Sequence, residues 1–400
     1  MRKIYPILFL VSILTVACGG SSGSGSRSMD STPEPAPTPE PTPAAEPQDP
    51  ENPRVSYDAV DALKAHAEFP IGMEVSAADQ ERSIFTLTDQ QPVLRYHFNQ
   101  LVAGLIMKMS YLHPGENTFY FEDADDLVDY ALANNMSMHG HTAIWFRDSQ
   151  IPDWMKSFTG DWDAMMHNHV YQILNHFADR VDSWDVVNEA VDYNWQTAEA
   201  SYRDDIFFQN MGAGYIENAF ISARAGDPNA ELYYNDFHLS YNNGKLDFIV
   251  AMLTDFLTRD IPVDGLGFQM HITLTSPSRE QMDAAFQKAV ATGLKIRISE
   301  LDIAINSRGP DYTGGPWAPE ESLSIPTARE QKQRYKDVVE SYLANVPAAQ
   351  RGGITVWGLV DGETWMRAVS HSEWEWPLLF NDDYTVKPAF YGVMEALTGQ

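Results

Sequence analysis

Ser183-Trp184-Asp185-Val186-Val187-Asn188-Glu189 is a largely apolar stretch that ends on two adjacent polar residues. Its length and its β-branched centre predict a buried strand. Segments of the same kind recur along the chain, at residues 69–75, 101–109, 137–145, 231–237, 265–271, 295–303 and 353–360. The sequence therefore predicts eight strands.

Longer amphipathic segments lie between these strands and predict helices, at residues 122–134, 163–178, 204–225, 245–258, 279–292 and 328–345. Strands that alternate with helices form parallel sheets. Eight such units in about 330 residues predict a sheet that closes into a (β/α)8 TIM barrel. The alternative of an open dinucleotide-binding sheet is weakened, because no glycine-rich phosphate-binding motif follows the first strand.

Composition and charge narrow the class of ligand. The 400 residues are 44% hydrophobic and carry a formal net charge of −29. A surface this acidic repels nucleic acid and anionic membranes, so neither is expected as a partner. An uncharged ligand meets no such repulsion. Aromatic residues make up 12% of the chain and could stack on sugar rings, although most of them are expected to fill the core.

The N-terminus predicts export. Arg2 and Lys3 precede an apolar segment, residues 4–16, which is too short to span a membrane comfortably. Together with the Cys18-Gly19 pair that follows, this segment resembles a bacterial lipoprotein signal. The resemblance implies cleavage after residue 17, lipidation of Cys18, and anchoring at the outer membrane or cell surface. The alternative is an ordinary signal peptide with an incidental cysteine. Cys18 is the single cysteine of the chain, so an intramolecular disulfide is excluded.

A linker follows the predicted signal peptide. Residues 19–28 are rich in Gly and Ser, and residues 32–53 are rich in Pro, Thr and Glu. Neither segment can bury a core, and the prolines favour an extended conformation. We therefore expect residues 1–17 to be a signal peptide, residues 18–54 a linker, and residues 55–400 a single catalytic domain.

Polar residues cluster where the predicted strands end. In a (β/α)8 barrel the functional groups lie at the C-terminal ends of the strands. Glu189 ends the fourth strand and Glu300 lies near the end of the seventh, so the two carboxyl groups should face each other. Hydrolysis of a glycosidic bond requires two such groups, about 5–5.5 Å apart for retention and about 6.5–9.5 Å for inversion. A structural salt bridge is the alternative role for either glutamate alone.

Several motifs carry a family resemblance. Residues 184–190 and Ser299-Glu300-Leu301-Asp302-Ile303 resemble the two signatures of glycoside hydrolase family 10, the retaining endo-β-1,4-xylanases. The likeness extends, in the right order, through residues 140–142, 233–236, 264–271 and 353–358, and it covers nearly everything from about Val55 onward.

The resemblance implies a role for each matching residue. Glu189 would be the acid/base and Glu300 the nucleophile, while His271 would help to hold the charge of Glu300. Asn188 would bind the 2-hydroxyl of the sugar at the cleavage point. The remaining substrate-binding residues would be Lys108, His141, Trp145, Gln269, Trp357 and Trp365. No cofactor is implied. His139 and His141 alternate on one strand and could suggest a metal, but sugar contact or core packing is the favoured interpretation, so no metal site is expected.

The sequence departs from the family pattern at Gly104, Leu105 and Phe146, where the family usually has Glu, Asn and His. These changes are expected to lie together on the glycone side, the side of the sugars that stay on the nucleophile. Gly104 is expected to leave space there for a bulkier sugar. We therefore expect a monomeric, retaining, endo-acting enzyme on xylan or on substituted or methylated xylan. A glycanase for hexose-containing glycans and a catalytically impaired glycan-binding barrel are the alternatives.

Overall fold

Eight parallel strands form a closed barrel. The computed structural model describes residues 49–307, 319–369 and 374–400. Each strand pairs with the next in order, and pairing between the last two, β10 and β11, closes the ring because β11 also pairs with β1. The predicted (β/α)8 fold is confirmed. The barrel strands are β1 (Ile71–Val75), β2 (Gln100–Ala103), β3 (Ser137–Trp145), β4 (Ser183–Asn188), β7 (Glu231–Asp236), β8 (Gly265–Phe268), β10 (Lys295–Ala304) and β11 (Arg351–Val356).

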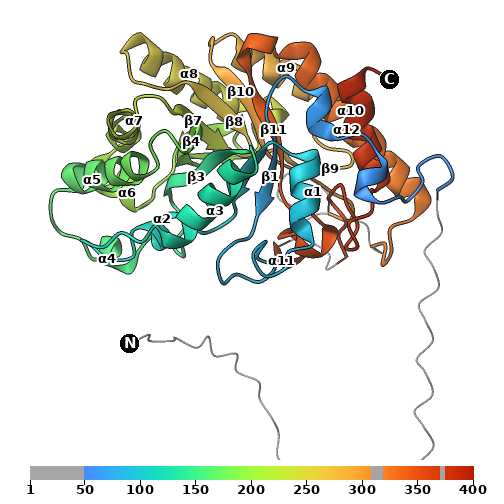
Figure 1. Ribbon diagram of the computed structural model, residues 1–400. Helices are drawn as coiled ribbons and strands as arrows, with labels where there is room; N and C mark the ends of the chain where they lie inside the picture. Colours follow the sequence, from blue (N-terminus) through green and yellow to red (C-terminus); the bar gives the residue numbers. More distant parts are fainter. Residues whose placement is uncertain (1–48, 308–318, 370–373) are drawn as a thin grey trace, which may run out of the picture. The chain divides into compact units, whose positions relative to one another are not determined.

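A helix follows each barrel strand and packs outside the ring, as Figure 1 shows. The structure adds α1 and α12 to the helices predicted from the periodicity. In chain order the eight helices are α1 (Gln90–His97), α3 (Glu122–Ala133), α5 (Trp162–His176), α7 (Gly214–Gly226), α8 (Gly244–Thr258), α9 (Arg279–Val290), α10 (Ile325–Asn345) and α12 (Pro388–Thr398). Short helices α2 (Met109–Leu112), α4 (Asp153–Lys156), α6 (Ile206–Met211) and α11 (Met366–Val369) lie in the connections.

Several predicted elements have other bounds in the structure; the eighth strand, for example, ends at Val356 rather than at residue 360, and three further differences affect the connections. The helix expected over residues 204–225 is two helices, α6 and α7, because Gly212 adopts a φ of +62° that ends the first one. The second strand ends at Ala103 rather than at residue 109, so Gly104 to Lys108 form a loop. The sixth strand ends at Phe268, and a short strand β9 (His271–Thr273) resumes the pairing after Met270, whose φ is +55°.

The strand-to-helix connections at the C-terminal ends of the strands also carry a hairpin. Strands β5 (Val191–Asn194) and β6 (Glu199–Tyr202) form this hairpin directly after Glu189. Because Glu189 itself lies at the junction between β4 and the hairpin, both elements determine where its side chain points.

The packed part of the chain reaches back beyond residue 55. Asp49 forms an ion pair with Arg329 at 2.6 Å, and Asn52 accepts a hydrogen bond from Lys332 at 2.7 Å, so both are tied to α10. The predicted signal peptide, Cys18 and most of the predicted linker lie outside the described residues. Within the described ranges, no helix is both long and apolar enough to cross a bilayer.

Candidate active site

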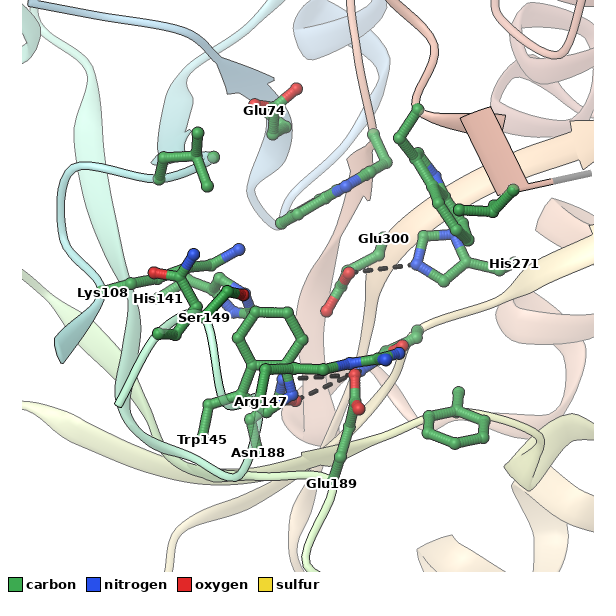
Figure 2. Close-up of a pocket in the computed structure, with 18 of the residues that line it drawn as sticks. Glu74, Lys108, His141, Trp145, Arg147, Ser149, Asn188, Glu189, His271 and Glu300 are labelled. Atoms are coloured by element: carbon green, nitrogen blue, oxygen red, sulfur yellow. Dashed lines mark hydrogen bonds and ion pairs between the residues drawn. The ribbon is translucent and has the colours of Figure 1, made fainter. Parts of the chain in front are cut away.

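One pocket of about 900 Å³ lies where the barrel strands end. Figure 2 shows Glu189 and Glu300 facing into it from different strands, with Lys108, His141 and Trp145 along one side. The structure brings together all the catalytic and substrate-binding residues expected from the sequence: the pocket is lined by Lys108, His141, Trp145, Asn188, Glu189, Gln269, His271, Glu300, Trp357 and Trp365.

The two carboxylate oxygens of Glu189 have different surroundings. Oε1 accepts hydrogen bonds from Gln269 Nε2 at 3.0 Å and from Asn188 Nδ2 at 3.4 Å. Oε2 is buried and has no hydrogen-bond partner within the described part of the chain. A buried oxygen without a partner is costly unless a ligand or solvent pairs with it. Oε2 is therefore the oxygen available to exchange a proton with a ligand in the pocket.

The backbone holds Glu189 in a strained but supported conformation. Its φ is +60°, in the left-handed region that non-glycine residues seldom adopt. Its N–H donates to Asn235 O at 2.9 Å, and its carbonyl accepts from Arg203 Nε at 2.9 Å. Because both peptide groups are fixed, the side chain is directed into the pocket.

Glu300 is held in the charged form. Its Oε1 accepts from Asn235 Nδ2 at 2.7 Å, and its Oε2 lies 3.1 Å from His271 Nε2. Burial alone would raise the pKa of Glu300, but the hydrogen bond from His271 and the neighbouring positive charge outweigh burial and lower it. An ionised carboxylate is the form that attacks carbon.

His271 connects Glu300 to a deeper carboxylate. Its Nδ1 lies 2.8 Å from Asp302 Oδ1, and Trp365 Nε1 donates to the other oxygen of Asp302 at 2.8 Å. Burial disfavours a charged imidazole, but Asp302 and Glu300 outweigh that effect and raise the pKa of His271 to about 10. At neutral pH the ring therefore carries both protons and donates one to each carboxylate.

Asn235 links the two halves of the site. Its Nδ2 donates to Glu300 Oε1 and also to Asn188 Oδ1, the latter at 3.0 Å. Ser299 Oγ donates to Asn235 Oδ1 at 2.6 Å, which fixes the orientation of the amide. The side-chain amide of Asn188 is also within hydrogen-bond distance of Gln269 Nε2, at 3.1 Å. Asn235, Ser299 and Asp302 were given no role from the sequence, although each lies in one of the motifs quoted above.

His139 and His141 both contact Asp185, and of the two only His141 also lines the pocket. His139 Nε2 and His141 Nδ1 lie 3.1 Å and 2.9 Å from Asp185 Oδ2. Burial would raise the pKa of Asp185, but the two imidazoles hold it well below its usual range. One ligand atom each from His141, Asp185 and Glu300 lie within 4.8 Å of one another and could in principle hold a metal ion. Each of these side chains already has a protein hydrogen-bond partner.

Lys108 and Trp145 form part of the pocket wall near Glu300. Lys108 Nζ lies 4.5 Å from the centroid of the Trp145 ring, within the range of a cation–π contact. Burial lowers the pKa of Lys108, while the negative charges of Glu300 and Glu74 oppose the shift. Lys108 is thus a hydrogen-bond donor inside the pocket, where neighbouring acidic side chains, rather than solvent, stabilise its positive charge.

The expectations for Gly104 and Phe146 need correction. A Cβ at Gly104 would lie 1.9 Å from Glu74 Oε1, so the expected space is filled by a carboxyl group from β1. Among the described residues, Phe146 is not one that lines the pocket: Arg203 stacks over its ring at 3.9 Å and also bonds the Glu189 carbonyl. The three substitutions are therefore not grouped together, and Leu105 alone adds apolar surface beside Gly104.

This arrangement defines a class of protein. One carboxyl group is kept ionised, another has an oxygen without a partner in the described ranges, and both lie at the strand ends of a (β/α)8 barrel. That combination is the architecture of a glycoside hydrolase with two catalytic carboxyl groups.

The chain belongs to glycosyl hydrolase family 10, whose family model matches residues 61–396. It is 43% identical over 357 residues to the endo-β-1,4-xylanase Xyn10C of Cellvibrio japonicus, covering 85% of this chain and 58% of that protein. It is 40% identical over 348 residues to endo-1,4-β-xylanase A of the same species, covering 84% and 57%. The chain thus spans under two thirds of the length of these relatives.

Solved structures agree with the sequence relatives. Native xylanase 10C from Cellvibrio japonicus matches with a TM-score of 0.81 and 41% identity, covering 87% of this chain and 74% of that one. A mutant of the same xylanase in complex with xylopentaose matches with the same TM-score and identity, covering 71% of that chain.

We predict that the ring of His271 keeps both protons until about pH 10. The imidazole of an unfolded chain titrates at about pH 6.5. The ion pairs of His271 therefore stabilise the fold fully below that pH. Their contribution is lost as the pH rises toward 10. NMR of histidine side chains, with the signal assigned by its loss in His271→Gln, measures the titration directly. A midpoint near 6.5 would contradict the ion-paired site.

Proposed function

We propose that this protein is a retaining endo-β-1,4-xylanase that works by double displacement. The observation that carries the proposal is the contrast between the two carboxyl groups: His271 and Asn235 hold Glu300 ionised, while Glu189 Oε2 has no hydrogen-bond partner among the residues that the structure describes. A double displacement needs one carboxylate that attacks and one carboxyl group that exchanges protons.

In the first step an oxygen of Glu300 attacks the anomeric carbon of the sugar at the cleavage point. The bond from that carbon to the glycosidic oxygen breaks, and Glu189 gives its proton to the departing oxygen. The product is a glycosyl ester on Glu300 and an ionised Glu189. In the second step Glu189 takes a proton from water, the resulting hydroxide attacks the same carbon, and the ester bond breaks. Two inversions at one carbon retain its configuration.

The other residues of the pocket are assigned to sugar binding. The amide of Asn188, which lines the pocket beside Glu189, suits the 2-hydroxyl of the sugar at the cleavage point, where a hydrogen bond strengthens in the transition state. Apolar ring faces suit the faces of a pyranose. The residues assigned to sugar contact in this way are Lys108, His141, Trp145, Gln269, Trp357 and Trp365.

Xylan is the proposed substrate for two reasons. The two relatives named above are endo-xylanases, and one solved relative holds xylopentaose. In addition, the Glu74 carboxyl occupies the volume beside Gly104 that motivated a bulkier hexose. A loss of catalytic function is disfavoured, because a binding protein has no need of an ionised nucleophile paired with His271.

The location proposed is the outside of the cell, with a lipid anchor on Cys18 at the outer membrane or cell surface. Support comes from the basic residues Arg2 and Lys3, the short apolar segment at residues 4–16, and the single cysteine. The Pro-rich linker up to residue 54 would hold the barrel away from the membrane. An insoluble or polymeric substrate also has to be cut outside the cell.

Glu189→Ala is predicted to slow the first step only when the leaving group needs a proton. For phenyl β-xylobioside, kcat/KM should fall about 10²–10⁴-fold. For dinitrophenyl β-xylobioside, whose leaving group departs without a proton, the fall should be less than about tenfold. Glu300→Ala should abolish turnover of both. Steady-state kinetics on purified variants gives these values.

The matched control for these variants is Glu330→Ala, which removes an exposed carboxylate on α10 and should leave both rate constants unchanged. An equal loss on both leaving groups in Glu189→Ala would contradict its role as the acid. Hydrolysis of either substrate by Glu300→Ala at the natural rate would contradict its role as the nucleophile.

Cys18→Ala is predicted to release the protein from membranes. Lipid chains provide the membrane affinity in the proposed anchor, so removing the acylated thiol should move the enzyme from the membrane fraction to the soluble exported fraction. Fractionation of cells, followed by xylanase assay of each fraction, measures the change. Equal membrane association of the natural chain and the variant would contradict lipid anchoring at Cys18.

A further inference from the structure

Glu74 is a carboxyl group in the pocket that the proposed mechanism does not use. It lies on β1 between Met73 and Val75, both of which belong to the hydrophobic core. Because side chains alternate along a strand, Glu74 points the other way, into the barrel opening. It lines the pocket together with Gly104, Leu105 and Lys108.

Glu74 fills the place of a missing side chain on the neighbouring strand. Glu74 pairs in register with Val102, and Gly104 N donates to Val75 O at 3.0 Å, so residue 104 lies directly beside the end of β1. A Cβ built on Gly104 would lie 1.9 Å from Glu74 Oε1 and 3.0 Å from its carboxyl carbon. A side chain at position 104 and the present position of Glu74 exclude each other. Glu74 therefore supplies a carboxyl group from β1 to the part of the pocket beside position 104.

The carboxyl group of Glu74 has no hydrogen-bond partner among the described residues. No hydrogen bond or ion pair joins Glu74 to another described side chain, although its surroundings are charged. Burial raises the pKa of Glu74 to about 8, the negative charges of Glu363 and Glu300 add to the shift, and Lys108 opposes it. Glu363 lies on the short helix η5 (Asp361–Glu363) of the last connection. At neutral pH Glu74 thus carries a proton and can both donate and accept.

The position of Glu74 relative to the catalytic pair identifies what it can touch. Figure 2 shows Glu74 and Glu189 at opposite ends of the pocket. In the proposed mechanism, on which this inference rests, Glu189 protonates the leaving group, so the leaving sugars lie on its side. The sugars that stay on Glu300 extend toward Glu74 and Lys108.

We propose that Glu74 determines glycone specificity, by hydrogen-bonding the hydroxyl groups of the sugar one unit beyond the one attached to Glu300. It takes over from β1 the contact that a side chain at position 104 would make from the second strand. The ligand is a β-1,4-linked pentose unit, and Lys108 is its neighbouring donor.

The test compares two substrates that differ by this one sugar. Nitrophenyl β-xyloside places one sugar on the glycone side, and nitrophenyl β-xylobioside places two. The kcat/KM value for the xylobioside divided by that for the xyloside measures the contribution of the second sugar. Glu74→Ala should lower this ratio about tenfold, the effect of losing one or two hydrogen bonds. Glu330→Ala is the matched control and should not change it.

Two further variants separate a specific contact from a general structural effect. Glu74→Gln keeps a donor and an acceptor, so it should retain most of the ratio. The double variant Glu74→Ala/Gly104→Glu returns a carboxyl group from the second strand and should recover the ratio lost in Glu74→Ala. In the natural chain the ratio should fall as the pH rises through about 8, when Glu74 loses its proton in the presence of Lys108, Glu363 and Glu300. In Glu74→Gln that decline should be absent.

Several results would overturn the inference. An unchanged ratio in Glu74→Ala would do so, as would an equal loss on both substrates that the double variant fails to repair. A natural chain that hydrolyses neither xyloside would instead contradict the proposed function. In that case calorimetric titration with xylobiose still tests the role of Glu74. If Glu74→Ala and Glu74→Gln both bound xylobiose as tightly as the natural chain does, that role would be overturned.

Discussion

The doubly protonated ring of His271, which donates one proton to Asp302 and the other to Glu300, is the feature on which the rest of the site depends. Burying a carboxylate normally favours its neutral form, and neutral Glu300 could not attack carbon. With carboxylates 2.8 Å and 3.1 Å from its two nitrogens, His271 remains a cation far above neutral pH. Its positive charge stabilises the ionised form of Glu300. Trp365 completes the chain by donating to Asp302. In the proposed mechanism the nucleophile is thus prepared by groups that do not themselves react.

The barrel makes this charge arrangement possible by bringing distant strand ends together. Asn235 on β7 bonds both Glu300 on β10 and Asn188 on β4, so three strands are fixed to one another at the point of reaction. Such preorganised donors act on a transition state without having to reorient, which is the usual source of their catalytic effect. The same fold allows the exchange that we propose at the glycone end, since adjacent parallel strands end side by side and a carboxyl group can be supplied from β1 in place of β2.

Periodicity was enough to predict the eight strands, the barrel and the positions of Glu189 and Glu300, because a strand reveals its direction and its polar end in consecutive residues. The end of β2 was not predictable, since the apolar run continues past Gly104 into a loop. Neither was the replacement of its missing side chain by Glu74. That replacement depends on how far a side chain on one strand reaches toward the next, and Glu74 and Gly104 are 30 residues apart in sequence. Composition and spacing do not encode such a contact. The bridging role of Asn235 was not predictable for the same reason.

The central claim is that Glu300 forms a covalent intermediate while Glu189 exchanges protons, and the configuration of the first product tests it most directly. Proton NMR during hydrolysis of a xylo-oligosaccharide shows which anomer appears before the sugar equilibrates in water. Double displacement predicts that the β anomer is released first and that the α anomer grows in later by mutarotation. Initial release of the α anomer would mean a single displacement by water, and it would contradict the assignment of Glu300 as nucleophile.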